Sequence, residues 1–191
     1  MPNLYIISGC NGAGKTTASF TVLPEMLDCR EFVNVDEIAR GLSPFQPEKV
    51  AVEAGRIMLQ RIDGLLKKQE DFAIETTLAT RSYVQTIKKA KENGYHITLV
   101  YFWLNSLELA IARVKRRVAE GGHNIPEEVI RRRYKKRIKN LFHLFILIRD
   151  YRIIIDNSQK PYIVVAEGQE GKALIVQDQS IWKKLKMLSY E

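Results

Sequence analysis

The chain has 191 residues, of which 46% are hydrophobic and 27% are charged. These values exclude a disordered or fibrous protein, and the length fits a single globular domain that we expect to span residues 1–191. Lys and Arg outnumber Asp and Glu by 30 to 22, and this net charge of +8 favours an anionic partner such as nucleic acid, a membrane surface or a phosphorylated metabolite.

Strands and helices are predicted to alternate along most of the chain. Short apolar or β-branched runs predict five strands, at Leu4–Ser8, Phe32–Asp36, Phe72–Ile74, His96–Leu104 and Arg152–Ile155. Apolar residues at steps of three and four predict helices over about 14–27, 47–69, 82–93, 106–120 and 126–145. A hairpin over 163–166 and 173–177 and a helix over 182–188 follow. The pattern predicts an α/β three-layer sandwich with a mostly parallel five-stranded sheet and a C-terminal hairpin and helix.

No segment of the sequence indicates export or membrane insertion. No signal peptide led by Lys or Arg precedes the apolar run Leu4–Ser8, and that run is too short to cross a bilayer. Two cysteines, Cys10 and Cys29, do not make a disulfide framework, and the three histidines have no metal-site spacing. We therefore expect a cytoplasmic protein without a membrane partner.

A phosphate-binding motif follows the first predicted strand. Gly9–Thr16 matches GxxxxGK[ST] in full and opens the first predicted helix. Glycines allow such a loop to wrap a phosphate with its backbone N–H groups, and the helix N-terminus adds partial positive charge. Lys15 is expected to reach the β- and γ-phosphates, and Thr16 to ligate Mg²⁺. The predicted cofactors are ATP and Mg²⁺, and the predicted nucleotide-binding residues are Gly9, Asn11, Gly12, Ala13, Gly14, Lys15, Thr16 and Thr17.

Two acidic residues narrow the class of nucleotide-binding protein. The sequence has neither the NKxD and DxxG motifs of GTPases nor the LSGGQ-like signature of ABC-type ATPases. Asp36 and Glu75 instead stand at the ends of two predicted strands, and the carboxyl ends of parallel strands converge on the ligand crevice. Two carboxylates there can activate an alcohol and anchor metal or substrate, which favours a small-molecule kinase. The alternative for Asp36 is a role in capping the next helix.

One basic stretch holds the entire net charge. Between Arg113 and Lys139 there are eleven Lys and Arg against three acids. Arg113 and Arg117 share a helical face that leads into Gly121–Gly122, which suits a lid, at about 113–139, that closes over the transferred phosphoryl group. Solvated surface is the preferred interpretation for Lys135, Lys136 and Lys139.

A nucleic-acid footprint is the rival interpretation of the basic stretch. Against it, the aromatic residues Tyr134 and Phe142 fall on the apolar stripe of the helix rather than among the basic residues. Further along, Asp156–Ser158 follows the fifth predicted strand. Asn157 in this segment either helps to hold adenine or belongs to a tight Asx turn.

Several segments together resemble the zeta toxin family. They span roughly residues 3–160 and comprise Gly9–Thr17, Asn34–Glu37, Phe72–Thr77, Arg113–Arg117, Gly121–Pro126 with Arg131–Tyr134, and Asp156–Ser158. The resemblance implies an ATP-dependent P-loop kinase, and in the toxins a sugar hydroxyl of UDP-N-acetylglucosamine is phosphorylated. It also implies a partner, because toxins of this family are held inactive by a small helical antitoxin.

The resemblance assigns roles to individual residues. Asp36 would take the hydroxyl proton, Lys15 and Thr16 would handle ATP and Mg²⁺, and Glu75 and Thr77 would hold the substrate. Arg113 or Arg117, with one of Arg131–Arg133, would stabilise the transferred phosphoryl group. The predicted catalytic residues are Asp36, Lys15, Arg113 and Arg117, and the predicted substrate-binding residues are Glu75, Thr77, Arg81 and Arg133.

The resulting hypothesis is a Mg·ATP-dependent kinase that phosphorylates a hydroxyl of a small anionic metabolite, with UDP-N-acetylglucosamine as the first candidate. Two alternatives stay open. One is a nucleoside or polynucleotide 5′-hydroxyl kinase. The other is a non-catalytic ATP-binding module associated with nucleic acid.

Overall fold

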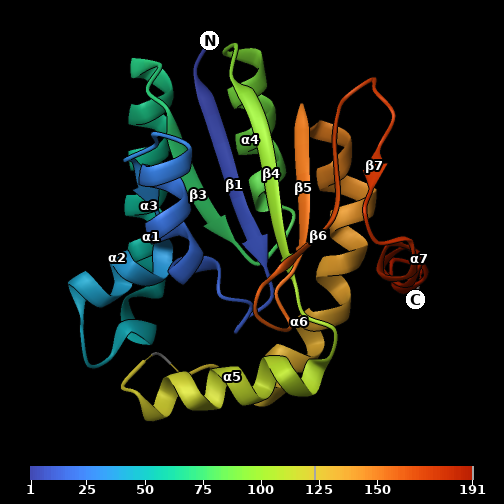
Figure 1. Cartoon of the computed structure of the whole chain (residues 1–191). Coiled ribbons are helices and arrows are strands. Elements are labelled where there is room, and N and C mark those ends of the chain that lie inside the picture. The colour runs from blue at the N-terminus through green and yellow to red at the C-terminus, as the bar shows by residue number, and fades with distance from the viewer. Residues whose placement is uncertain (123, 191) are drawn as a thin grey trace.

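A computed structural model describes residues 1–122 and 124–190. Its strands form one sheet in the order β2-β3-β1-β4-β5-β6-β7 (Figure 1). The strands are β1 (Asn3–Gly9), β2 (Phe32–Val33), β3 (Phe72–Thr76), β4 (His96–Trp103), β5 (Tyr151–Asp156), β6 (Ile163–Gln169) and β7 (Ile175–Val176). The first five pair in parallel, as predicted, and β6 and β7 extend the same sheet in antiparallel fashion. The sheet of the described residues therefore has seven strands, two more than the five predicted, because the hairpin pairs with β5.

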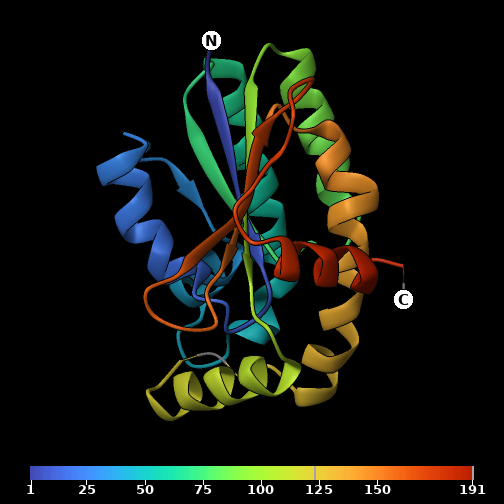
Figure 2. The ribbon, with the colours of Figure 1, turned by 45° about the vertical axis from the view of Figure 1, so that its right-hand side comes forward.

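Helices cover both faces of this sheet, as Figure 2 shows for α1 on one side and α4 and α6 on the other. The α-helices are α1 (Lys15–Met26), α2 (Val35–Leu42), α3 (Ala51–Lys68), α4 (Ser82–Glu92), α5 (Leu107–Ala119), α6 (Glu127–Asn140) and α7 (Gln179–Leu188). Three short helices join them, η1 (Pro47–Val50), η2 (Leu141–Phe145) and η3 (Ile146–Ile148). None of the helices in the described ranges combines the length and apolarity needed to cross a membrane.

The central strand β1 is buried on both faces. Ile6 lies between Ile74 of β3 and Leu99 of β4, and packs in a core with residues of α3, α4 and α6. Tyr5 and Ile7 point the other way, into a second core shared with α1 and α5. Because both faces of a parallel sheet are covered, its strands are continuous apolar runs, which is the pattern that predicted them.

The second predicted strand ends earlier than expected. The strand predicted over 32–36 is wrong beyond Val33, because Asn34 begins helix α2. The Asn34 Oδ1 atom accepts hydrogen bonds from the backbone N–H groups of Asp36 (2.9 Å) and Glu37 (3.4 Å), so it caps the helix. Asp36 therefore stands in the first turn of α2. The single helix predicted over 47–69 is likewise divided into η1 and α3.

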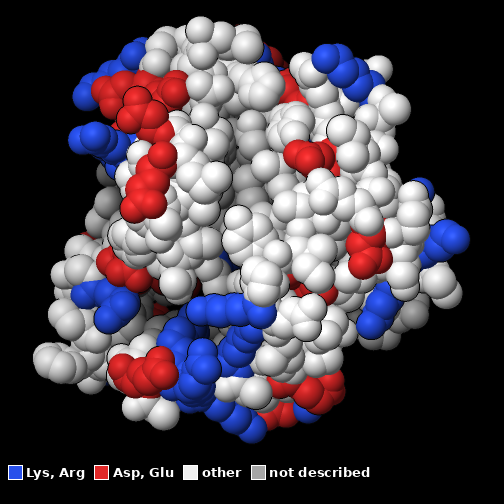
Figure 3. All heavy atoms as spheres, viewed as in Figure 1, with Lys and Arg blue, Asp and Glu red and all other residues white. Residues whose placement is uncertain are grey.

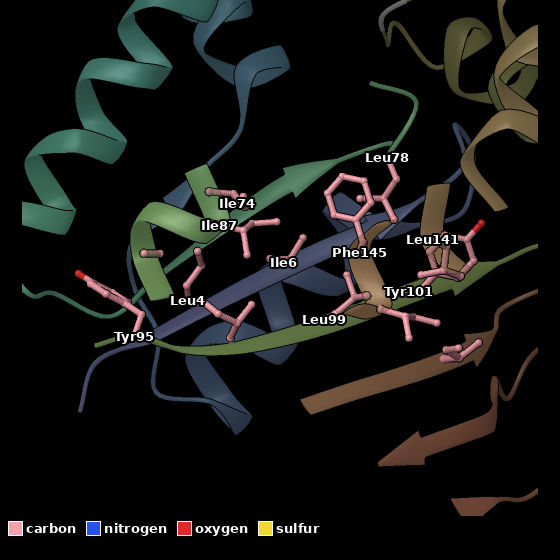
Figure 4. Close-up of a cluster of buried hydrophobic side chains, with 14 of the residues drawn as sticks. Leu4, Ile6, Ile74, Leu78, Ile87, Tyr95, Leu99, Tyr101, Leu141 and Phe145 are labelled. Carbon is pink, nitrogen blue, oxygen red and sulfur yellow. The ribbon is translucent and has the colours of Figure 1, made fainter. Parts of the chain in front are cut away.

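The core under α6 fixes the loop that follows β3. Figure 4 shows Leu78 of this loop beside Phe145, near Tyr101 and Leu141. Leu78 is fully buried and adopts a left-handed backbone conformation (φ +55°), and its carbonyl accepts a hydrogen bond of 2.6 Å from Asn140 Nδ2. Packing of this kind offsets the cost of an unfavourable backbone conformation. The loop thus holds its threonines at the carboxyl edge of the sheet.

Candidate functional site

The Gly9–Thr16 loop connects β1 to α1 and depends on its glycines. Gly9 has φ +142°, and a Cβ there would lie 2.2 Å from the carbonyl oxygen of Phe102. Gly12 has φ +79°, and its Cβ would lie 2.8 Å from the carbonyl oxygen of Ala110 in α5. Neither position can take a side chain without a shift in the backbone of the neighbouring element. These glycines therefore allow the loop to pass close to the backbone of β4 and α5.

The same loop leaves the start of α1 open to a phosphate. Gly14 is the N-cap residue, has a left-handed conformation and brings no side chain to bond the first backbone N–H groups of the helix. Those groups, and the positive end of the helix dipole, are the features that bind phosphate. Thr17 is exposed in the first turn of α1, whereas Ala13 is fully buried.

Lys15 lies folded over the loop and is 6% exposed. Its Nζ atom donates to the carbonyl oxygen of Cys10 at 3.1 Å and lies 3.5 Å from Oε1 of Glu75. Burial lowers the pKa of Lys15, while the charges of Glu75 and Asp36 act in the opposite direction. The ammonium group is thus a largely desolvated cation whose electrostatic attraction to a phosphate is stronger than it would be in water.

Glu75, at the carboxyl end of β3, joins three segments of the site. Its Oε2 atom accepts hydrogen bonds from Thr16 Oγ1 (2.7 Å) and from Asn34 Nδ2 (2.9 Å), while Oε1 faces Lys15. Glu75 is predicted to hold substrate, and this position also places it on the nucleotide side. Asn34 was missed by the sequence reasoning, although the spacing of Asn34 and Glu37 before an amphipathic helix resembles a capping-box signal.

The donor set beside Lys15 fits Mg²⁺. A hydroxyl and a carboxylate, on Thr16 and Glu75, are hard oxygen ligands, and Mg²⁺ usually takes only one or two such protein groups together with water and substrate phosphates. Among the described residues there is no cluster of three or more His, Cys, Asp or Glu side chains that could hold a metal by themselves. A metal in this site would therefore depend on the nucleotide for its remaining ligands.

A cavity of about 410 Å³ opens beside this centre. It collects side chains from the phosphate loop, α2, η1, the β3–α4 loop, the segment 124–126 and α6. Five of the predicted site residues line it, namely Asn11, Asp36, Glu75, Thr77 and Arg133. Arg81 does not, because it is exposed at the N-cap of α4, so its predicted substrate contact is not supported by this arrangement.

The two predicted lid arginines of α5 lie toward the phosphate loop rather than among the residues that line the cavity. Arg113 packs its stem against Gly12 and donates from Nη2 to the carbonyl oxygen of Ser158 at 3.0 Å. Burial lowers the pKa of Arg113, as does the neighbouring Arg116, and Asp156 opposes the shift. Arg117 is close enough to Lys15 for its charge to lower the pKa of that lysine.

The segment after β5 braces the phosphate loop. Asn157 Nδ2 donates to the carbonyl oxygen of Ala13 at 2.8 Å. Asp156 Oδ1 accepts from the Ser158 backbone N–H at 2.9 Å and from the Ser158 hydroxyl, which is the Asx turn that the sequence offered as an alternative. The side-chain amide of Asn157 is thus occupied by the loop, and nothing in this geometry supports the predicted contact with adenine.

Basic side chains gather over α5, in the lower part of the face drawn in Figure 3. Several pair with acids on the surface. Lys115 and Arg131 both contact Glu127, at 3.3 and 2.7 Å, and this links α5 to α6. The aromatic residues face inward, as predicted. Tyr134 Oη donates to the carbonyl oxygen of Leu104 at 2.6 Å, and Phe142 packs against Trp182. His123 of the predicted lid loop lies outside the described residues.

Comparison with known proteins identifies the family. The family model described as Zeta toxin matches residues 1–163. The chain belongs to the zeta toxin family. A protein of Haemophilus influenzae (strain ATCC 51907 / DSM 11121 / KW20 / Rd), itself uncharacterized, is 35% identical over 127 residues, which is 66% of this chain and 88% of that protein.

Two solved structures of complexes contain similar chains. The AvrRxo1-ORF1:-ORF2 complex with ATP contains a chain that matches with a TM-score of 0.78 and 18% identity, over 97% of this chain and 63% of that one. This member of the zeta toxin family therefore spans less than two thirds of that relative. The PezAT chromosomal toxin-antitoxin system of Streptococcus pneumoniae contains a chain that matches with a TM-score of 0.67 and 16% identity, over 100% of this chain and 85% of that one. At these identities the likeness shows the fold, which is the α/β fold of P-loop kinases.

Proposed function

We propose that the protein is a kinase that transfers the γ-phosphoryl group of Mg·ATP to a hydroxyl group. The observation that carries this proposal is the position of Glu75. One carboxylate contacts Thr16 and Lys15 on the nucleotide side and Asn34, the cap of the Asp36 helix, on the side of the cavity. A nucleotide in the phosphate loop and an acceptor in the cavity would therefore meet at the end of β3.

The nucleotide half binds and orients ATP. The backbone N–H groups of the loop and of the α1 N-terminus would receive the phosphates, and Lys15 would neutralise charge on the β- and γ-phosphates. Thr16 and Glu75 would hold Mg²⁺, which when bound screens the charge between the phosphates. The ATP-bound AvrRxo1-ORF1:-ORF2 complex, which shares this fold, supports the choice of nucleotide.

The acceptor half positions the hydroxyl group. Asp36 is exposed on the cavity, and its backbone is fixed by the Asn34 cap. In the proposed step the hydroxyl oxygen bonds to the γ-phosphorus, the bond from that phosphorus to the β–γ bridging oxygen breaks, and the proton of the hydroxyl passes to the Asp36 carboxylate. Arg113, Arg117 and Arg133 would neutralise charge on the transferred group, with the segment of about 113–139 acting as a lid.

The proposal also names a candidate acceptor and a candidate protein partner. Membership of the zeta toxin family supports UDP-N-acetylglucosamine as the first acceptor to test, and Arg133 in the cavity suits a small anionic metabolite. A small antitoxin protein is the proposed partner, because the PezAT system contains a chain of this fold in a toxin-antitoxin pair. A polynucleotide 5′-hydroxyl is the second candidate acceptor, favoured by the basic surface over α5.

A ³¹P NMR and mass-spectrometric screen tests the proposal. Purified protein with ATP and Mg²⁺ is incubated with UDP-N-acetylglucosamine, ribonucleosides and an oligonucleotide with a free 5′-hydroxyl. We expect ADP and one phosphomonoester product, formed on the sugar nucleotide. A product on the oligonucleotide alone would favour the second candidate. ATP binding without a phosphorylated product from any acceptor would contradict a kinase.

A further inference from the structure

One arginine of α6 is buried without a counter-ion. Arg137 is fully buried, at 0% exposure. Its Nε atom donates to the backbone carbonyl oxygen of Arg133 at 2.8 Å, but Nη1 and Nη2 have no hydrogen-bond partner among the described residues. Burial lowers the pKa of Arg137 to about 9, and no acid in the described part of the chain opposes the shift. The guanidinium group therefore stays charged at neutral pH.

This buried charge is costly for the fold. An ion loses its hydration when it is buried, and an apolar residue of similar size in its place usually leaves the free energy of unfolding unchanged or raises it. The ring of Tyr134, with its centroid 5.8 Å from Cζ of Arg137, offsets part of the cost through a cation–π contact. Packing alone therefore does not account for an arginine at this position.

Arg137 lies behind the wall of the cavity of about 410 Å³ that contains Asp36, which we call the acceptor cavity. Arg133 lines this cavity, and Arg137 follows it by four residues on the same face of α6. Long side chains of a helix point toward its N-terminus, and the hydrogen bond from Nε to the Arg133 carbonyl oxygen has this direction. The guanidinium group of Arg137 is thus directed toward the turn of α6 that carries Arg133.

The next turn of α6 is bonded to another part of the cavity wall. Asn140, three residues after Arg137, donates from Nδ2 to the carbonyl oxygen of Leu78 at 2.6 Å. Leu78 belongs to the β3–α4 loop, which contributes Thr77 to the lining of the acceptor cavity. The helix is therefore fixed to the cavity wall on both sides of Arg137. Across such a buried region, the field of a charge is screened less than it would be in water.

The charges of the acceptor cavity show what a further cation would contribute. Among the described residues, three acids and one cation line it, namely Asp36, Glu48, Glu75 and Arg133. Lys15 lies 3.5 Å from Glu75 and balances one of these carboxylates, and the cation in the lining balances a second. One negative charge is left, which would repel an anionic ligand. The charge of Arg137 cancels it.

We propose that Arg137 is a positioning residue that allows the acceptor cavity to hold an anionic group, and that it acts through Arg133 without contact with the ligand. Repulsion between the two guanidinium groups keeps the Arg133 side chain directed into the cavity, and the buried charge offsets the carboxylates of the lining. This inference rests on the proposed function, in which an anionic acceptor occupies the cavity. It adds a residue that lowers stability and raises affinity for the anion.

Three variants separate the charge of Arg137 from its volume. Arg137→Met keeps an unbranched side chain but removes the charge, whereas Arg137→Lys keeps the charge. Arg149→Met is the matched control, because Arg149 is also buried with no hydrogen-bond partner for Nε among the described residues. It precedes β5, and the opposite end of this strand leads to Asn157 beside the phosphate loop. Urea denaturation should show the free energy of unfolding of Arg137→Met unchanged or raised. A marked loss of stability would overturn the inference, because Arg137 would then serve the fold.

Phosphate binding, followed by NMR, tests the role of the charge without any need for catalysis. Protein with ¹⁵N-labelled arginine is saturated with Mg²⁺ and AMPPNP, a non-hydrolysable ATP analogue, so that the phosphate loop is occupied. Inorganic phosphate is then titrated to millimolar concentration, and the Nε signal of Arg133 reports binding in the cavity. We expect Arg137→Met to raise the dissociation constant by about three- to tenfold, and Arg137→Lys and Arg149→Met to stay within about twofold of wild type. Unchanged affinity in Arg137→Met, or no Arg133 shift in wild type, would overturn the inference.

Steady-state kinetics then connect the charge to the reaction. With the acceptor that the ³¹P NMR screen identifies, Arg137→Met should raise the acceptor KM by a similar factor, with kcat within about twofold and the KM for ATP unchanged. A fall in kcat at unchanged acceptor KM would overturn the positioning role. Failure of the proposed function is distinguishable, because wild type would then phosphorylate no acceptor, while phosphate would still shift the Arg133 signal and Arg137→Met would still weaken that binding.

Discussion

The two halves of the site are built in different ways. The nucleotide half comes from one continuous segment, Gly9–Thr16, and offers mainly backbone groups whose positions follow from glycine conformations and one helix N-terminus. The proposed acceptor half is assembled from α2, η1, the β3–α4 loop and α6, and offers side chains. In the proposed function, the first arrangement would recognise phosphate in a general way, whereas single substitutions in the second would change acceptor specificity. Variants of the two halves should therefore differ in their effect on ATP affinity.

The largest loss is expected from Lys15→Met in the nucleotide half. Removal of the ammonium group should lower phosphoryl transfer by about 10²–10³-fold, a typical effect for loss of one electrostatic stabiliser, and should also weaken ATP binding. Transfer rates and ATP titration calorimetry measure both effects. Lys88→Met, at an exposed position of α4, is the control and should match wild type. Retention of both wild-type activity and wild-type ATP affinity in Lys15→Met would contradict the role of the loop.

Glu75→Gln tests the junction of the two halves. The amide keeps the size of the side chain but removes the negative charge beside Thr16 and Lys15. We expect the Mg²⁺ concentration needed for half-maximal transfer to rise by about 10–100-fold, as is usual when a group that binds or orients around a metal is lost. Glu25→Gln, exposed on α1, is the matched control. An unchanged Mg²⁺ requirement would place the metal away from Glu75.

Variants of Asn34 distinguish its contribution to stability from its contribution to the position of Glu75. Asn34→Ala removes the α2 cap and should lower the free energy of unfolding by about 1 kcal/mol, measured by urea denaturation. Asn34→Asp keeps a capping oxygen but replaces the donor to Glu75 with a second carboxylate, so it should lower transfer by more than it lowers stability. Asp178→Ala removes the cap of α7, distant in sequence from the site, and should cost similar stability with unchanged transfer. If transfer fell only in proportion to the free energy of unfolding in both Asn34 variants, Asn34 would act as the cap of α2 and would have no further role in the site.

The smallest effect is expected at the surface ion pairs. Arg131→Gln removes one of the two cations that contact Glu127, both partly exposed. Exposed pairs contribute little, so the denaturation midpoint and the transfer rate should both stay within experimental error of wild type. A clear fall in transfer at unchanged stability would instead place Arg131 among the lid arginines that act on phosphate.

The sequence predicted the two halves unequally, for a physical reason. The phosphate loop is local, so spacing along the chain was enough to predict its position and its glycines. Asp36 was included in the candidate site and lines the cavity, but it was placed at a strand end, because apolar residues up to Val35 masked the cap at Asn34. Arg81, also predicted to bind substrate, is exposed at the N-cap of α4 and is not among the residues that line the cavity.

Tertiary packing decided what the sequence could not indicate. Tyr83 of α4 lines the acceptor cavity, and its hydroxyl contacts Met58 of α3, a residue 25 positions earlier in the chain. The hydrogen bond from Asn157 to Ala13 joins residues 144 positions apart. The sequence therefore predicted an adenine contact or an Asx turn for the segment after β5, but not that this segment braces the loop. Contacts of this kind have no signal in local patterns.

Asp36→Asn tests the central claim most directly. Single-turnover transfer of γ-³²P from ATP is measured together with ATP affinity, with Glu37→Gln, the exposed neighbour in the same helical turn, as the control. The predicted result is a loss of transfer of about 10²–10⁴-fold in Asp36→Asn at unchanged ATP affinity, and wild-type behaviour in Glu37→Gln. Transfer at the wild-type rate in Asp36→Asn would show that the acceptor hydroxyl does not depend on this carboxylate.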